Sequence, residues 1–217
     1  MRTGRPRNFC VDETLDRAMT VFWRQGYEGA SLADLTAAMG INSPSLYACF
    51  GSKEGLFHAV VDRYEARRNS FMEKVLAAPD AQSVAKAFLY GVADFAADTS
   101  GKNPPGCLML QGGLTCGEPE IPDDLARRRA EKECLLRKRL ESARKDGDLP
   151  KHADPATLAR YLVTMANGIS VQAASGATAK ELRAVADVAL LGWPASQKPA
   201  AQKSVKGKAR ARVEDPA

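Results

Sequence analysis

The segment from Ser31 to Phe50 constrains the fold most strongly, because it predicts two short helices joined by a tight turn. Ser31 is a favourable helix N-cap, and Asp34 follows three residues later, where a carboxylate reaches back to free backbone amides in an Asp variant of the capping box. Gly40 stands where a helix ends in the left-handed conformation, which glycine adopts without steric cost. The first helix is expected to bury one stripe at helical spacing, formed by Leu32, Leu35 and Met39.

The second helix of this pair is very short, and its exposed edge carries small polar side chains rather than charge. Ile41 is expected to fill the corner between the two helices. Ser43 and Pro44 are expected to restart the chain as N-cap and first helical residue, since proline lacks the amide hydrogen that a first turn leaves unpaired. The leading edge is expected to present Ser43, Ser45 and Tyr47. An ordinary helical hairpin explains the capping equally well. The short helix, glycine turn and polar edge together favour a helix that enters the major groove of DNA.

The sequence on both sides of this segment carries further motifs. Upstream, a helical stripe ends at Gly26-Tyr27; its members are Leu15, Ala18, Met19, Phe22 and Trp23. Taken together, A-x(3)-F-x(3)-G-Y, S-L-x-D-L and G-I-N-S-P-S-L-Y-x-x-F-x-S-K-E-x-L, over roughly residues 9 to 62, resemble the TetR family of bacterial transcriptional regulators. The sequence departs from the family at Ala48-Cys49, where many members carry an aromatic or basic pair, so the resemblance assigns no DNA contact to those two positions.

The resemblance implies a homodimeric regulator, most often a repressor, that a small-molecule effector releases from double-stranded DNA. It implies that Tyr47 and Lys53 contact phosphates and that Ser43, Pro44 and Ser45 face base edges; Ser31 is assigned to the same DNA-binding set. Two identical heads would then stand about 34 Å apart, or a multiple of that distance, on an inverted-repeat operator. An effector that prefers another pose of the helix after Ser52 would lower DNA affinity by its differential binding.

The positive charge of the chain is concentrated at its two ends. The net charge is +5, of which residues 1–8 carry +3 and residues 198–217 carry +4, so the rest of the chain is slightly acidic at −2. Gly4-Arg5-Pro6-Arg7 resembles the core of an AT-hook, in which Arg5 and Arg7 enter a narrow minor groove. A solvated, disordered terminus is the alternative. The lysine-rich C-terminal segment is expected to be a disordered basic tail that either solubilises the protein or adds weak non-specific DNA affinity.

Composition excludes several other classes of protein. The sequence has no run of about 18 apolar residues, so no membrane span is predicted. The basic N-terminal segment lacks the apolar stretch of a secretory signal. An odd number of cysteines, five, without a C-x-x-C pair argues against a disulfide framework and a zinc site, and for a reducing cytosol. We therefore expect a cytosolic protein that needs no metal or cofactor, and the resemblance implies that this is the bacterial cytosol.

The pattern after residue 52 is helical throughout, and the whole chain is predicted to be all-α with about nine helices. The predicted organisation is a basic arm over 1–8, a helix-turn-helix domain over 9–55, a ligand-binding and dimerisation domain over 56–193, and the tail over 194–217. The helices expected in the larger domain are Ser52 to Leu76, Gln82 to Thr99, Cys107 to Cys116, Pro122 to Asp146, Asp154 to Ala174 and Ala179 to Leu191.

Two sets of apolar residues in this larger domain are candidate sites. The last two helices combine long apolar faces with small residues, which favours a dimer seam over intramolecular packing alone; its predicted members are Leu158, Leu162, Met165, Gly168, Ile169, Ala173, Leu182, Val185 and Val188. In a chain that resembles this family, the fifth and sixth helices surround an effector pocket, to which we assign Phe88, Val92, Phe95, Met109 and Leu110. Plain core packing is the alternative interpretation of the second set.

Other chemistry-bearing residues are weaker candidates. His58 and His152 have no carboxylate or serine at a plausible triad spacing, so a catalytic site is not predicted; a cysteine enzyme would need an activated thiol paired with histidine. The run Arg127 to Arg129 is interpreted as a solvated face that pairs with acids such as Glu131 and Glu133, although a bound anion is conceivable. A redox-gated regulator that uses Cys107 and Cys116, or an effector-free one, is the alternative to ligand control.

Overall fold

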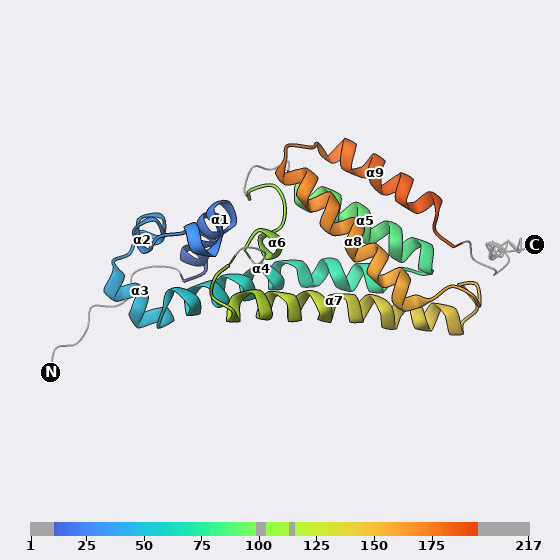
Figure 1. Cartoon of the computed structure of the whole chain (residues 1–217), viewed down its shortest axis with the longest axis horizontal. Coiled ribbons are helices and arrows are strands. Elements are labelled where there is room, and N and C mark those ends of the chain that lie inside the picture. Colours follow the sequence, from blue (N-terminus) through green and yellow to red (C-terminus); the bar gives the residue numbers. More distant parts are fainter. Residues whose placement is uncertain (1–10, 99–102, 113–115, 195–217) are drawn as a thin grey trace, which may run out of the picture.

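A computed structural model describes residues 11–98, 103–112 and 116–194, and all the regular structure in them is helical (Figure 1). The predicted all-α fold is therefore confirmed. The helices are α1 (Val11–Gly29), α2 (Leu32–Met39), α3 (Ser43–Phe50), α4 (Lys53–Leu76), α5 (Ala81–Ala97), α6 (Leu108–Gln111), α7 (Glu120–Lys145), α8 (Pro155–Ala174) and α9 (Ala179–Leu191).

The three N-terminal helices form one end of an elongated molecule, and their boundaries follow from local capping. Ser31 caps α2, and the reciprocal capping box with Asp34 is present. Gly40 ends α2 in the left-handed region, at φ 67° and ψ 31°. The predicted N-cap of α3 is wrong by one residue: Asn42 holds that position and its side chain accepts a hydrogen bond from the Ser45 amide at 2.9 Å. Asparagine caps at least as well as serine, so Ser43 becomes the first helical residue.

Helix α1 buries the predicted stripe but bends near its end. Gly26, at φ 72°, interrupts the helical conformation, so the last residues leave the axis of the preceding turns. The core of this end of the molecule also includes the first half of α4 as far as Tyr64, and Leu108, Met109, Ile121 and Leu125 from α6 and α7. Within α2, Leu35 and Met39 are buried while Leu32 is half-buried. A domain boundary at residue 55 remains a prediction, since α4 and this core continue across it.

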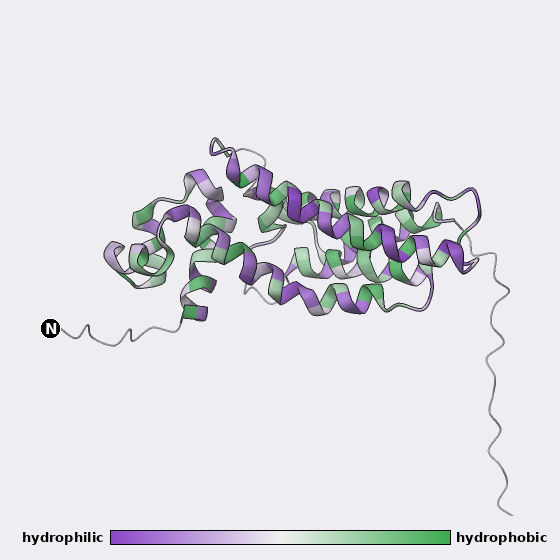
Figure 2. Cartoon of the chain, turned by 90° about the horizontal axis from the view of Figure 1, so that it is seen from below, coloured by the Kyte–Doolittle hydropathy of each residue, from purple (hydrophilic) through white to green (hydrophobic). Residues whose placement is uncertain are grey.

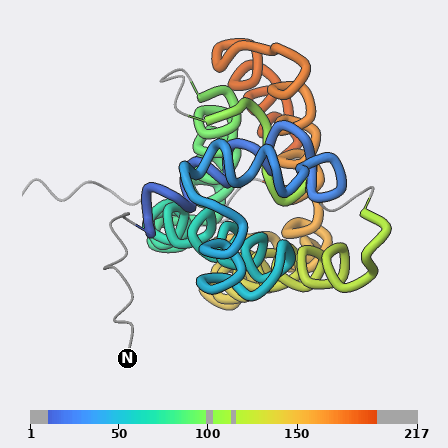
Figure 3. Tube along the Cα trace, turned by 90° about the vertical axis from the view of Figure 1, so that its left-hand side faces the viewer, coloured from blue at the N-terminus to red at the C-terminus, as the bar shows by residue number. Residues whose placement is uncertain are grey.

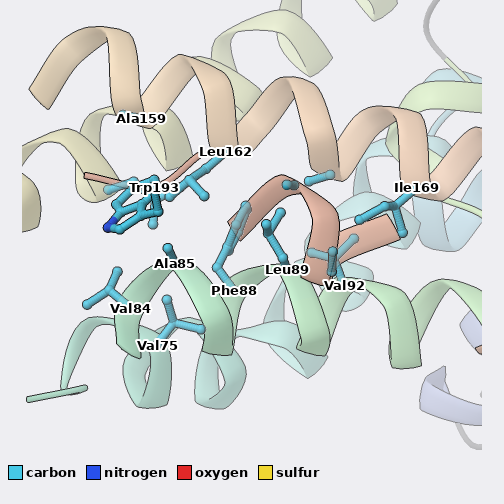
Figure 4. Close-up of a cluster of buried hydrophobic side chains, with 14 of the residues drawn as sticks. Val75, Val84, Ala85, Phe88, Leu89, Val92, Ala159, Leu162, Ile169 and Trp193 are labelled. Atoms are coloured by element: carbon cyan, nitrogen blue, oxygen red, sulfur yellow. The ribbon is translucent and has the colours of Figure 1, made fainter. Parts of the chain in front are cut away.

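The remaining helices form a second core around α5. Helix α5 packs against α8 and α9, while α7 packs against α8 and lies beside α4 (Figure 1). Figure 4 shows the apolar side chains that meet here, with Phe88, Leu89 and Val92 from α5 opposite Leu162 and Ile169 from α8. Apolar and polar residues are mixed along every helix, as expected of amphipathic helices around a shared core (Figure 2).

Most predicted helix boundaries in this part agree with the structure, and α6 is the main exception. The segment expected to be helical from Cys107 to Cys116 forms only a four-residue helix, which Gly112 ends in a turn; residues 113–115 lie outside the described residues. Helix α7 begins at Glu120, before the predicted Pro122, because proline is tolerated in a first turn that has no amide partners to lose.

Candidate nucleic-acid interface and ligand cavity

The exposed surface of α3 carries most of the predicted DNA contacts. Leu46 is fully buried and fixes the helix on the N-terminal core, while Ser43 and Pro44 are exposed and Ser45 is half-buried. Tyr47 is 47% exposed, which is high for a large aromatic side chain. Seen along the long axis from this end, α1–α3 lie toward the viewer together with the first turns of α4 (Figure 3). A ligand as large as a DNA duplex can therefore reach this end.

Lys53 stands at the start of α4, directly after the turn that follows α3. Its ammonium nitrogen lies 4.6 Å from the centroid of the Tyr27 ring, so a cation–π contact holds the charge at this end of the molecule. The hydroxyl of Ser31 is exposed, but it donates to Asp34 at 2.7 Å as part of the cap. The predicted arm residues Arg5 and Arg7 lie outside the described residues.

Ion pairs connect α1 to α4 behind this surface. Asp16 accepts hydrogen bonds from Arg63, one of them 3.0 Å long, and pairs with Arg67 at 2.5 Å. Asp12 pairs with Arg63 at 3.0 Å. Partial burial acts to raise the pKa of Asp16, but the two guanidinium groups outweigh it and hold that pKa below its ordinary value. These contacts attach the N-terminal helices to α4 with charge-assisted hydrogen bonds.

A cavity of about 90 Å³ lies among α4, α5, α6, α7 and α8. Four of the five predicted ligand-binding residues line it, namely Phe88, Val92, Met109 and Leu110. Phe95 does not: its ring packs against the guanidinium of Arg68, whose central carbon lies 4.3 Å from the ring centroid. The remaining apolar wall comes from Phe71, Met72, Val163 and Ala166.

The cavity also has three cationic side chains in its lining that were not predicted from the sequence, namely Arg68, Arg129 and Lys132. The sequence does contain a signal for Arg68, because Arg68 stands four residues after Tyr64 and three before Phe71, so helical spacing places it on the same face of α4 as these two aromatic residues. A cation at a core position of an amphipathic helix needs either a partner or a function.

The arginine run on α7 divides between two environments. Arg127 pairs with Asp124 and Glu131, and Arg128 pairs with Asp62, Glu65 and Asp124, as expected of a charged face. Arg129 instead donates to the backbone carbonyl of Met109 at 2.8 Å. The predicted role of Glu133 in this face is wrong, because Glu133 pairs with Arg160 of α8 at 3.0 Å.

The predicted dimer seam needs correction, because four of its nine members lie in the core of the single chain. Leu162, Ile169, Ala173 and Leu182 are 0–1% exposed through packing against α5 and between α8 and α9, so they present no surface to a partner. Val185 and Val188 are exposed at 49% and 68%, Gly168 is exposed, and Leu158 and Met165 are half-buried. Val171 and Leu191 add further exposed apolar surface on the same two helices.

The cysteines and histidines have mixed surroundings. Cys107 lines the cavity and its sulfur accepts from the Tyr64 hydroxyl at 3.4 Å. Burial, together with the nearby Glu28 carboxylate, raises the pKa of the Cys116 thiol, which disfavours the reactive thiolate. His58 lies 3.5 Å from Glu54, one turn earlier on α4, and 3.3 Å from Asp124 of α7, which is distant in sequence, so the expectation of no carboxylate partner for His58 is wrong. Among the described residues, no three potential metal ligands gather in one place, and no helix is both long and apolar enough to cross a membrane.

Comparison with known proteins agrees with this geometry. The sequence profile described as "Bacterial regulatory proteins, tetR family" matches residues 15–60. The HTH-type transcriptional repressor ComR of Escherichia coli (strain K12) is 39% identical over 194 residues, which cover 88% of this chain and 92% of that protein. A solved structure of a cysteine mutant of the TetR family transcriptional regulator CifR, complexed with a 26-base-pair operator DNA, has 40% identity and a TM-score of 0.82, and the match covers 88% of this chain and 100% of that one. The similarity therefore extends over both the α3 surface and the helices around the cavity.

Proposed function

Because this chain belongs to the TetR family of bacterial regulatory proteins and is a sequence-specific DNA-binding transcriptional regulator, we propose that it is a homodimeric repressor which a small molecule releases from its operator. The exposed α3 surface, held by the buried Leu46, carries the DNA-binding part of this proposal. Ser43, Pro44 and Ser45 face base edges, and Tyr47 and Lys53 bind phosphates. The protein would act in the bacterial cytosol, and ComR is named a repressor.

Helix α6 supports the link between ligand and DNA, because it contacts both parts of the molecule. Met109 and Leu110 line the cavity, while Leu108 is fully buried in the N-terminal core. The carbonyl oxygen of Gln111 lies 3.7 Å from the position that a Cβ on Gly26 would take, at the bend of α1. A ligand that displaces α6 therefore acts directly on α1, which packs against α2 and α4 in the N-terminal core.

Helix α4 provides a second, continuous connection. Its first turns contribute Leu56 and Phe57 to the N-terminal core, and its later turns contribute Arg68 and Phe71 to the cavity. A tilt of α4 changes the distance between the two α3 helices of a dimer, which must match successive major grooves. A preference of the ligand for the tilted pose of about 1–3 kcal/mol is typical of such coupling.

The proposal is tested by operator selection with the full-length protein. Binding to random genomic fragments, followed by footprinting, is expected to yield an inverted repeat whose half-sites lie a whole number of helical turns apart. Tyr47→Ala is expected to abolish retention of that fragment, whereas Tyr90→Ala, at a half-buried tyrosine of α5, is expected to retain it. An operator without inverted-repeat symmetry, or equal retention by both variants, would contradict the proposal.

A further inference from the structure

The charge of the cavity specifies the kind of ligand it accepts. Three cationic side chains line it, and none of its described lining residues is acidic. We propose that the cavity binds a small organic anion with an apolar body, a carboxylate in the simplest case, whose charged end pairs with Arg68. This inference rests on the proposed role of the cavity as the effector site, and it names the chemical class of the effector.

Arg68 carries the inference because no acidic side chain neutralises it. Among the described residues, no carboxylate lies within ion-pairing distance of its guanidinium. Its hydrogen-bonding neighbours are the hydroxyl of Tyr64 and the thiol of Cys107. Burial raises the pKa of the Tyr64 hydroxyl well above its usual range, so this phenol stays neutral at physiological pH and cannot act as the counter-ion.

The aromatic rings around Arg68 hold the cation but do not neutralise it. The central carbon of the guanidinium lies 4.3 Å from the Phe95 centroid and 5.1 Å from the Tyr64 centroid. Cation–π contacts of this kind compensate part of the desolvation of an arginine. A guanidinium has five N–H groups in a planar fork that matches the two oxygens of a carboxylate, so a bound anion satisfies both its charge and its remaining donors.

The other two cations differ in how far they are already neutralised. Lys132 pairs with Glu65 at 2.7 Å, so its charge is locally balanced. Arg129 donates to the Met109 carbonyl at 2.8 Å and has no carboxylate partner among the described residues. Arg129 therefore adds positive potential to the same cavity. Its hydrogen bond to Met109 also links this charge to α6, the helix through which the ligand is proposed to act.

The rest of the cavity wall is apolar, so it favours a ligand whose body is apolar as well. Phe71 and Phe88 stack with ring centroids 6.3 Å apart, and Val92, Met109 and Leu110 complete this side. One bound water needs roughly 10–15 Å³ of such space, so a cavity of about 90 Å³ accepts a small molecule such as one ring or a short alkyl chain. An inorganic anion would leave this apolar surface unused.

Matched pairs of acid and amide test the inference on the full-length protein. Benzoate and hexanoate are compared by calorimetry with benzamide and hexanamide, which share their shape but carry no charge. Each carboxylate is expected to bind at millimolar concentration or tighter, and at least tenfold more tightly than its amide. In Arg68→Met this preference is expected to disappear, with a roughly tenfold to hundredfold loss of carboxylate affinity, as is usual for a lost charge-assisted contact. Arg68→Lys retains the charge and is expected to keep part of the preference.

Arg137→Met is the matched control, because it removes the same charge from an exposed side chain of α7 outside the cavity. It is expected to bind all four probes as the wild type does. Equal binding of acid and amide by the wild type, no binding of either carboxylate, or an unchanged preference in a folded Arg68→Met would overturn the inference. Carboxylate binding that leaves the operator complex intact would instead contradict the proposed release mechanism and leave the anion site standing.

Discussion

At the scale of single residues, Lys53 and Tyr47 are expected to bind DNA through its backbone. Tyr47→Phe and Lys53→Ala should weaken binding to all sequences alike, and Lys53→Ala should lower the slope of log affinity against log salt by about 1, because one phosphate contact is lost. Lys86→Ala is the matched control, since Lys86 is an exposed lysine on α5 that lies 5.2 Å from the Tyr90 centroid in a similar cation–π contact. A change in base preference at constant overall affinity would contradict this assignment.

Asp16 is the second residue whose substitution has a predictable effect. Its pKa is lower in the folded chain than in the unfolded one, so the ionised carboxylate stabilises the fold above the unfolded pKa near 4, and this contribution is lost as pH falls through the folded pKa. Asp16→Asn should therefore cost about 1 kcal/mol in the free energy of unfolding at neutral pH, and the difference from wild type should shrink in acid. Urea denaturation of both proteins at neutral pH and in acid measures this difference in the free energy of unfolding. Glu73→Gln, at an α4 carboxylate with no ion pair among the described residues, should match wild type at both.

At the scale of the helices, Asp148 illustrates a cap supplied from far along the chain. Its carboxylate is buried and accepts a hydrogen bond from the Ala81 amide, at the start of α5, at 2.6 Å. Asp148→Ala should leave that buried amide unpaired and lower the free energy of unfolding by about 1–3 kcal/mol. Asp146→Ala, two residues earlier at an exposed position, should cost much less. Equal effects of the two changes in thermal and urea unfolding would show that Asp148 does not cap α5.

At the scale of the whole molecule, the exposed apolar surface of α8 and α9 is the remaining candidate for the dimer seam. Tyr161, Met165, Val185 and Val188 line a groove between these two helices. Val185→Glu combined with Val188→Glu should convert the dimer to monomers, because burying two carboxylates per subunit without partners is costly. Leu135→Glu, at an exposed apolar residue of α7, should leave the dimer intact. Sedimentation velocity measures the oligomeric state of both variants, and operator binding is measured in parallel.

Gly168 provides an independent test of the same seam. Outside the neighbouring backbone of α8, nothing lies within 4 Å of the position that its Cβ would take, so a side chain can start there without a clash inside the chain. Gly168→Leu should therefore leave the folded monomer unchanged and weaken the dimer through overpacking, by about 1–3 kcal/mol. A Gly168→Leu protein that dimerises as tightly as the wild type would place the seam elsewhere. A monomeric variant with undiminished operator affinity would show that operator binding does not need the dimer.

The sequence by itself determined the local structure of this protein and the identity of its DNA-binding unit. Capping residues such as Ser31 and Asp154, the left-handed Gly40 and the apolar periodicity of each helix act within a few residues, so they are readable from spacing alone. The length of α6 was predicted wrongly, because its N-cap residue, Cys107, makes no side-chain cap hydrogen bond and the end of the helix at Gly112 was not taken into account.

Only the tertiary structure decided which apolar and charged side chains face a site. Helices α8 and α9 carry apolar residues around much of their circumference, so packing against α5 determined that Leu162 and Ile169 are core while Val185 and Val188 are surface. Spacing placed Arg68 on the inner face of α4, but it could not reveal that no carboxylate from the other helices would come near it. That arrangement depends on contacts between residues far apart in sequence, because the electrostatic partners of a side chain are set by which helices lie beside it.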